Sequence, residues 1–157
     1  MHPKVEAALK QIPGKWILHR HADYGEIRSP ADFAKALHFD VERISKTLFL
    51  RVHGAEVKFG LAVCPVTKKI NLPYLATMLK SQWVELASAL DMEETLGYPT
   101  YGVSPLGAGD MPVFMDEQLF NYPTLLIGAG VLGEEIEISP FDLQTLARAQ
   151  RGTYCLK

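Results

Sequence analysis

Residues 46–66, KTLFLRVHGAEVKFGLAVCPV, carry the pattern that decides the fold. The segments KTLFLRV and EVKFGLAVCPV are rich in apolar and β-branched residues and are separated by His53-Gly54-Ala55. This pattern predicts two strands that form a hairpin. Because successive side chains of a strand alternate between its faces, Lys46 is expected on the same face as Leu48 and Leu50. A cation should therefore lie at the edge of an apolar sheet face.

The flanking sequence predicts further strands and several short helices. Strands are expected at 16–21, 112–116, 123–127 and 134–138, and helices at 5–9, 30–37, 72–79, 84–96 and 140–146. Ser29-Pro30 and Ser139-Pro140 supply an N-cap followed by proline at the first helical position. Strands and helices mix without a regular βαβ rhythm, which predicts an α+β fold with a mixed, curved, barrel-like sheet flanked by helices.

Size and composition indicate one domain spanning residues 1–157. The apolar content of 48% suffices for a core without disulfides or metal, and Cys64 and Cys155 form no CxxC pattern. The net charge of −2 provides no overall basic field, so any contact with RNA should be local and DNA is not an expected partner. No apolar run approaches the roughly 18 residues of a membrane span, so we expect a soluble, cytoplasmic protein.

A glycine- and proline-rich region is the expected place of the functional site. Seven of the 12 glycines lie between Gly97 and Gly133. Within it, the loop 97–107 should be rigid, because Gly102 permits close backbone approach or positive φ and Pro105 fixes the exit direction. Its backbone could orient a small ligand or a water, although a structural turn explains the composition equally well. Ser104 lacks the G-x-S-x-G context and a partner histidine expected of a nucleophile.

Residues 128–133 match the G-x-G-x-x-G pattern of dinucleotide sites and follow an apolar strand. That fingerprint requires a helix directly after the loop, whereas residues 134–138 alternate like a strand. Nucleotide binding is therefore a distant third hypothesis. Gly128, Ala129 and Gly130 are instead expected to form the wall of a tight pocket.

The titratable residues allow both functional and structural interpretations. Lys46 either extends to solvent from the strand end or, beside a cleft, holds a phosphate or polarises an ester carbonyl. His19 and His21 share one side of a strand, but no third metal ligand lies nearby, so packing is the simpler interpretation. Asp116 and Glu135 could meet the loops around Lys46, while solvated carboxylates are the simpler interpretation. Cys64 is interpreted as a buried small hydrophobe.

Taken in order, these segments resemble the YbaK-type editing domains, the family that includes the editing insertion of bacterial prolyl-tRNA synthetases and its free-standing relatives. The marks are Lys46 with its flanking residues, Leu61-Ala62-Val63 before Pro65, Gly97-Tyr98, the loop 102–107, Asp116-Glu117 and the stretch 128–133. Each motif is weak alone, but their order and spacing are specific, and the match runs along most of the chain.

The resemblance implies hydrolysis of the ester in misacylated tRNA, typically tRNA for proline carrying alanine, cysteine or another small residue, without metal or organic cofactor. The expected partners are the tRNA acceptor end and prolyl-tRNA synthetase. By resemblance, Lys46 grips the tRNA end or polar groups of the substrate, and the G-x-x-x-P element that ends in Ser104-Pro105 positions the ester and water. The catalytic set implied is Lys46, Gly102, Ser104 and Pro105, and the substrate-binding set is His21, Tyr101, Val103, Asp116, Gly128, Ala129, Gly130 and Glu135.

Two positions depart from the family pattern. Tyr101 replaces the first glycine of G-x-x-x-P, and Leu96 stands where relatives often have threonine before glycine. A tyrosine lacks the backbone freedom of glycine, and its ring could fill part of the pocket. Either a changed substrate range or weakened hydrolysis would follow. The main alternative is therefore a binding module of the same fold that recognises an aminoacyl-tRNA end or a protein partner without turnover.

Overall fold

The computed structural model describes residues 1–157 and contains five α-helices and eight strands arranged in two sheets. The helices are α1 (Pro3–Leu9), α2 (Pro30–Leu37), α3 (Leu72–Met78), α4 (Ala89–Thr95) and α5 (Pro140–Ala147). The strands are β1 (Trp16–Arg20), β2 (Ser45–His53), β3 (Phe59–Pro65), β4 (Trp83–Leu86), β5 (Val113–Asp116), β6 (Leu125–Gly128), β7 (Glu134–Ile138) and β8 (Gln150–Gly152). Three 3₁₀ turns complete the set: η1 (His21–Tyr24), η2 (Val41–Arg43) and η3 (Glu117–Asn121).

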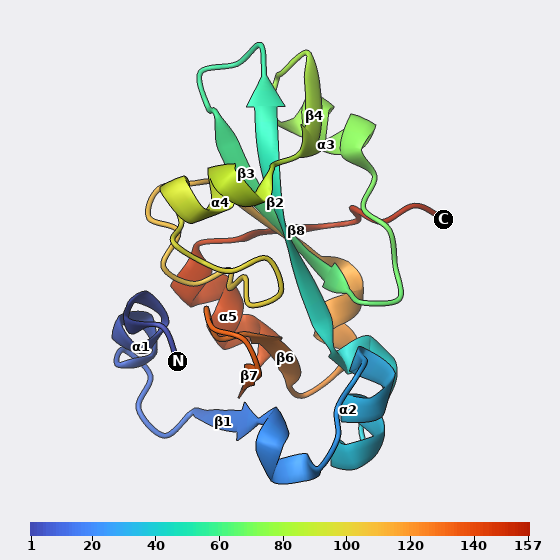
Figure 1. Cartoon of the computed structure of the whole chain (residues 1–157). Helices are drawn as coiled ribbons and strands as arrows, with labels where there is room; N and C mark the ends of the chain where they lie inside the picture. The colour runs from blue at the N-terminus through green and yellow to red at the C-terminus, as the bar shows by residue number, and fades with distance from the viewer.

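The predicted hairpin forms the centre of the larger sheet. Strands β2 and β3 pair antiparallel, with Lys46 opposite Cys64 and Phe49 opposite Leu61. The strand order of this sheet is β4-β2-β3-β5-β8, in which β5 pairs parallel with both of its neighbours. The long hairpin dominates the upper half of the molecule, with β4 beside one end of it (Figure 1). The sheet is therefore mixed, as expected.

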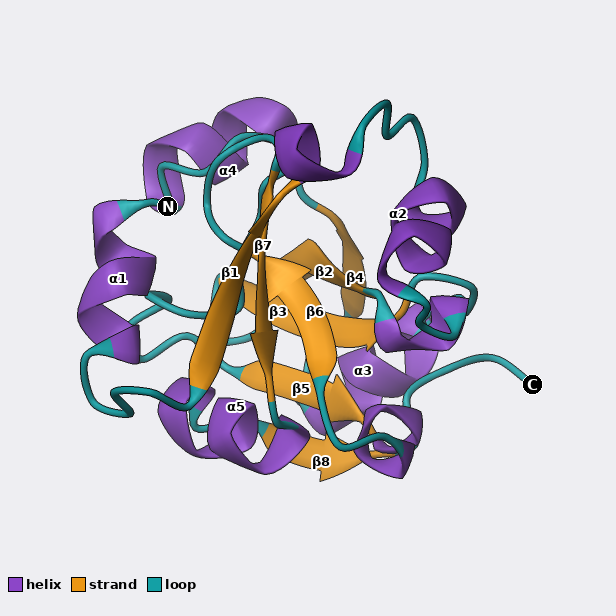
Figure 2. Ribbon diagram, turned by 90° about the horizontal axis from the view of Figure 1, so that it is seen from below, coloured by secondary structure: helices purple, strands orange, loops and turns teal.

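The smaller sheet is antiparallel, has the order β1-β7-β6, and crosses in front of the larger one (Figure 2). The two sheets meet at a parallel bridge between Ile44 and Leu126. Beside it, the Ser45 hydroxyl donates to the Leu126 carbonyl at 2.5 Å. The predicted α+β class and mixed strand directions are confirmed, although a single bridge joins two sheets where a continuous barrel would have an unbroken ladder.

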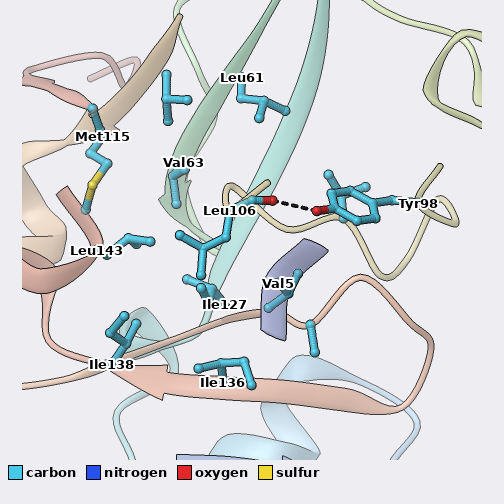
Figure 3. Close-up of a cluster of buried hydrophobic side chains, with 14 of the residues drawn as sticks. Val5, Leu61, Val63, Tyr98, Leu106, Met115, Ile127, Ile136, Ile138 and Leu143 are labelled. Carbon is cyan, nitrogen blue, oxygen red and sulfur yellow. Dashed lines mark hydrogen bonds between the residues drawn. The ribbon is translucent and has the colours of Figure 1, made fainter. Parts of the chain in front are cut away.

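The main core fills the space between the two sheets. Val63 and Met115 of the larger sheet face Ile127 and Ile136 of the smaller one, and all four are fully buried (Figure 3). Burial of such side chains is the main stabilising contribution to the fold. A second cluster, with Leu50 and Cys64, covers the opposite face of the larger sheet beneath α3.

The N-caps predicted at Ser29 and Ser139 are confirmed, since each hydroxyl accepts the backbone N–H three residues later. The helix predicted over 84–96 is wrong in its first part. Residues 83–86 form the edge strand β4, which pairs with β2, and α4 begins only after the Ser88 cap. Pairing with the hairpin edge outweighs the local helical pattern. None of the helices is both long and apolar enough to span a membrane.

Candidate active site

A cavity of about 280 Å³ lies where η1 and α2 meet the start of β2 and the start of β7. Its wall contains three of the predicted substrate-binding residues, His21, Tyr101 and Glu135. The complete lining is His21, Ile27, Arg28, Ser29, Pro30, Phe33, Ile44, Tyr101 and Glu135. Three parts of the chain that are far apart in the sequence, residues 21–44, Tyr101 and Glu135, therefore form one hollow.

His21 and Glu135 form the polar wall of this cavity. The distance from His21 Nε2 to Glu135 Oε2 is 2.8 Å. The side chain of Glu135 is 16% exposed, and burial raises its pKa, an effect that the hydrogen bond and charge of His21 oppose. The pair holds a carboxylate and an imidazole in a low-dielectric place, where each interacts strongly with a polar ligand.

The strand predicted to include His21 ends one residue earlier, at Arg20, and His21 begins η1. The backbone N–H of His21 still donates to the Gly133 carbonyl at 2.9 Å, which anchors the residue beside β7. His19 does not share the cavity, because its Nε2 pairs with Glu137 at 2.8 Å and its Nδ1 contacts Tyr24 at 2.7 Å. Each histidine thus has its own carboxylate, and the structure contains no cluster of three residues suited to a metal.

Phe33 and Ile44 form an apolar part of the wall. The Phe33 ring lies 4.6 Å from the His21 ring, and both Phe33 and Ile44 are buried. Phe33 and Ile44 were not predicted as site residues. The available signal for Phe33 was its place as an apolar residue on the helix that begins after the Ser29 cap.

The loop 102–105 packs directly on the end of β6. Gly102, Val103, Ser104 and Pro105 are all buried. A Cβ on Gly128 would overlap the Val103 carbonyl oxygen, and one on Gly102 would lie 2.8 Å from the Val131 carbonyl oxygen. Gly102 has no positive φ, so of the two reasons proposed for this glycine the structure supports close approach.

Ser104 acts within this loop as an acceptor. Its hydroxyl oxygen accepts the Leu106 N–H at 3.2 Å, and the side chain is fully buried. A buried hydroxyl engaged in a turn is poorly placed for nucleophilic attack. Pro105, the next residue, lines a separate hollow of about 240 Å³ together with Gly107 and Ala108.

A hydrogen bond from Tyr98 fixes the position of the far end of the same loop. Its phenol donates to the Leu106 carbonyl at 2.6 Å (Figure 3). Burial raises the Tyr98 pKa to about 12, so the donor keeps its proton throughout the neutral range. The loop is therefore held by a hydrogen bond at one end and by glycine contacts at the other.

Replacing Tyr98 by phenylalanine is expected to destabilise the fold by about 1–3 kcal/mol, because a buried carbonyl loses its donor. Urea unfolding at pH 7 measures this change. In wild type the folded state holds the phenolic proton more tightly than the unfolded state, so this contribution is complete below pH 10 and is lost as the pH rises towards 12. The free energy of unfolding of the phenylalanine variant should therefore fall less than that of wild type between pH 10 and pH 12. Equal free energies of unfolding of the two proteins at pH 7 would contradict a stabilising role of this hydrogen bond.

Lys46 lies two residues beyond the bridge that joins the two sheets. The bridge pairs Ile44 with Leu126 in parallel, and Gly128 lies two residues beyond Leu126 on the other chain. Gly128 packs against the Val103 backbone. Lys46 is half-buried and follows the cavity residue Ile44 by two positions without lining the cavity itself.

Comparisons with known proteins identify the family to which the chain belongs. The family model described as "Aminoacyl-tRNA editing domain" matches residues 25–146, which include the lysine, the loop and the glutamate of the cavity. The chain belongs to this family. A relative from Enterococcus faecalis, EbsC, described as a proposed Cys-tRNA(Pro)/Cys-tRNA(Cys) deacylase, is 30% identical over 123 residues, covering 78% of this chain and 74% of EbsC.

Two solved structures share the fold of this editing domain. A proposed trans-editing enzyme for prolyl-tRNA synthetase superposes with a TM-score of 0.84 at 21% identity, covering 100% of this chain and 99% of that one. The protein APE2540 superposes with a TM-score of 0.82 at 25% identity, covering 98% and 99%. The predicted resemblance and the class of enzyme, an aminoacyl-tRNA deacylase, are thereby confirmed at the level of the family.

Asp116 of the editing domain is not one of the residues that line the cavity. The expectation of a solvated carboxylate is wrong, since Asp116 is 0% exposed. Its oxygens accept the backbone N–H groups of Tyr154, at 2.9 Å, and of Gln118, at 3.0 Å. Asp116 therefore joins the C-terminal segment to β5. This contact is long-range and could not be predicted from the local sequence.

The glycines that were expected to wall a pocket instead contact the chain itself. Ala129 is fully buried and its carbonyl accepts the His2 N–H at 2.9 Å. Gly130 has a φ of +79°, and a Cβ there would overlap the His2 side chain. The strand β7 follows immediately at Glu134, which confirms that the helix of a dinucleotide fingerprint is missing.

Cys64 is a fully buried thiol, as predicted, and burial raises its pKa to about 11. Such a thiol carries almost no thiolate at neutral pH and is therefore a poor nucleophile. The chemistry of the domain must rest on other groups.

Proposed function

We propose that this chain is a free-standing deacylase that hydrolyses the ester of misacylated tRNA, with a small amino acid such as alanine or cysteine on tRNA for proline as its substrate. The observation that carries the proposal is the cavity of about 280 Å³ with the His21–Glu135 pair on its wall. Ligand cavities commonly measure ~300–1,000 Å³, so this one suits a small amino acid better than a nucleotide. EbsC, named for cysteine on tRNA(Pro), supports the same substrate class.

In this proposal the cavity receives the amino acid and the ester lies at its mouth. Glu135 accepts hydrogen bonds from the α-ammonium group, and His21 holds the carboxylate in place. Phe33 and Ile44 contact the side chain and limit its size. A methylene group changes the discrimination by only about 1–3 kcal/mol, so neighbouring small amino acids should be distinguished incompletely.

Hydrolysis then requires orientation more than a strong base. A water attacks the ester carbonyl carbon, the bond to the ribose oxygen breaks, and the neighbouring ribose hydroxyl can assist the proton transfer. In this proposal Lys46, two residues beyond the bridge between Ile44 and Leu126, holds a phosphate of the acceptor end or stabilises negative charge on the carbonyl oxygen. The buried loop 102–105 supplies fixed backbone groups, which cost little reorganisation during the reaction.

The net charge of −2 argues against an extended contact with the tRNA backbone. Contact confined to the acceptor end requires few phosphates to be neutralised, so binding should depend only weakly on salt. Prolyl-tRNA synthetase, which handles the same tRNA, is the proposed second partner. Cytoplasmic localisation follows from this role in translation.

The proposal is tested by deacylation of a panel of tRNAs charged with alanine, cysteine, serine, threonine and proline, with enzyme in excess. We expect rapid loss of one mischarged species and stable prolyl-tRNA. Tyr101→Gly, which restores the family residue, should shift the preference among the small amino acids. An inert wild type with an active Tyr101→Gly variant would replace the proposal with the alternative, a binding module of the same fold.

A further inference from the structure

Tyr101 places an uncovered aromatic ring on the rim of the cavity. It is 92% exposed, more than any other large hydrophobic side chain of the protein, yet it counts among the nine residues that line the hollow. Its ring has no aromatic partner, whereas Tyr24 packs near Phe33 and Tyr98 near His2. A face of the ring is therefore free to receive a planar ligand.

The backbone that carries this ring is anchored. Gly102, the next residue, donates its N–H to the Pro99 carbonyl at 3.0 Å and is buried against Val131. Tyr101 has no positive φ, so the tyrosine is accommodated without the backbone strain that the loss of a glycine would otherwise bring. A ring on an anchored loop loses little conformational freedom when it binds a ligand.

We propose that Tyr101 is a stacking platform for the base of the 3′-terminal adenosine of the tRNA. The inference rests on the proposed function, because the amino acid must enter the cavity for its ribose to lie at the mouth. The base then lies just outside, where the free face of Tyr101 is available. Stacking needs no hydrogen bonds from the base, which fits a rim that offers an open ring beside Ser29 and Pro30.

Loss of one base–aromatic stack typically weakens binding by about 5- to 150-fold. If the stack persists from ground state to transition state, the loss appears in KM while kcat stays nearly constant. We therefore expect Tyr101→Ala to raise KM by about tenfold or more, and Tyr101→Phe and Tyr101→Trp to retain the wild-type value. A role of the phenolic oxygen would instead separate Tyr101→Phe from wild type.

The experiment combines steady-state deacylation of the tRNA identified by the panel with calorimetric binding of a stable amide analogue, 3′-alanylamido-3′-deoxyadenosine. Phe141→Ala is the control, since it removes another exposed aromatic ring, 61% exposed, on the distant helix α5. Weaker analogue binding and raised KM in Tyr101→Ala, with both restored in Tyr101→Trp, support the stack. Unchanged KM and analogue affinity in Tyr101→Ala overturn it.

The two proposals fail in different ways. An active wild type that is indifferent to Tyr101→Ala contradicts the stacking platform and leaves the deacylase intact. A wild type without turnover contradicts the deacylase, and the analogue titration still decides whether Tyr101 contacts the nucleoside.

Discussion

Replacing Lys46 by alanine is expected to lower kcat/KM for deacylation about 100-fold, which is typical for loss of one group that stabilises charge in the transition state. Lys46 lies two residues beyond the cavity residue Ile44, whose parallel bridge to Leu126 joins the two sheets. Its removal leaves the hydrophobic core intact, because the side chain is only half-buried. Single-turnover deacylation at saturating and subsaturating enzyme separates an effect on binding from one on chemistry.

The matched control is Lys58→Ala, which removes an exposed lysine from the opposite end of the same hairpin. Lys58 should be dispensable for activity, and the free energy of unfolding in urea of both variants should equal that of wild type to within about 0.5 kcal/mol. Equal activity of Lys46→Ala and Lys58→Ala would show that Lys46 is an ordinary surface lysine.

Replacing Gly128 by alanine is expected to lower both the stability of the fold and the deacylation activity. The added Cβ would overlap the Val103 carbonyl oxygen, so either β6 or the loop 102–105 must move. Forcing atoms into a packed region costs about 1–3 kcal/mol, and a displacement of about 1 Å at a catalytic loop lowers activity about 100-fold. Urea unfolding and deacylation should therefore both change, in contrast to Lys46→Ala, which changes activity alone.

Gly60→Ala provides the comparison for this effect. Gly60 also lies in a strand, but a Cβ there would meet its nearest neighbour, the Pro112 carbonyl oxygen, at 3.4 Å. We expect a small change in stability and near wild-type activity. A Gly128→Ala protein as stable and active as Gly60→Ala would be inconsistent with a loop held by that contact.

Sequence patterns predicted the helices and strands that depend on residues close together in the chain. The alternation of residues 46–66 predicted the central hairpin, and the Ser-Pro starts predicted α2 and α5. The strand β4 was missed because its partner, β2, lies some 30 residues earlier in the chain, and the short β8 because its pairing with β5 is likewise non-local. Such pairings depend on tertiary contacts that outweigh single-segment propensity.

The cavity was only partly predictable for the same reason. The family resemblance indicated His21 and Glu135, but their 2.8 Å contact depends on the pairing of β1 with β7. Asp116 shows the converse, because a carboxylate at the end of a strand looks solvated until its long-range partner Tyr154 is known. The sequence showed that the Tyr101 ring could fill part of the pocket, and the structure places the ring on the rim of the cavity, where it is exposed.

The central claim is catalysis, and its most direct measurement is the release of amino acid from mischarged tRNA for proline by a substoichiometric amount of the wild-type protein. We expect each protein molecule to release many equivalents of alanine or cysteine and to leave prolyl-tRNA intact. Release of no amino acid above the spontaneous rate, or protection of the ester by bound protein, would contradict it and identify the chain as a binding module.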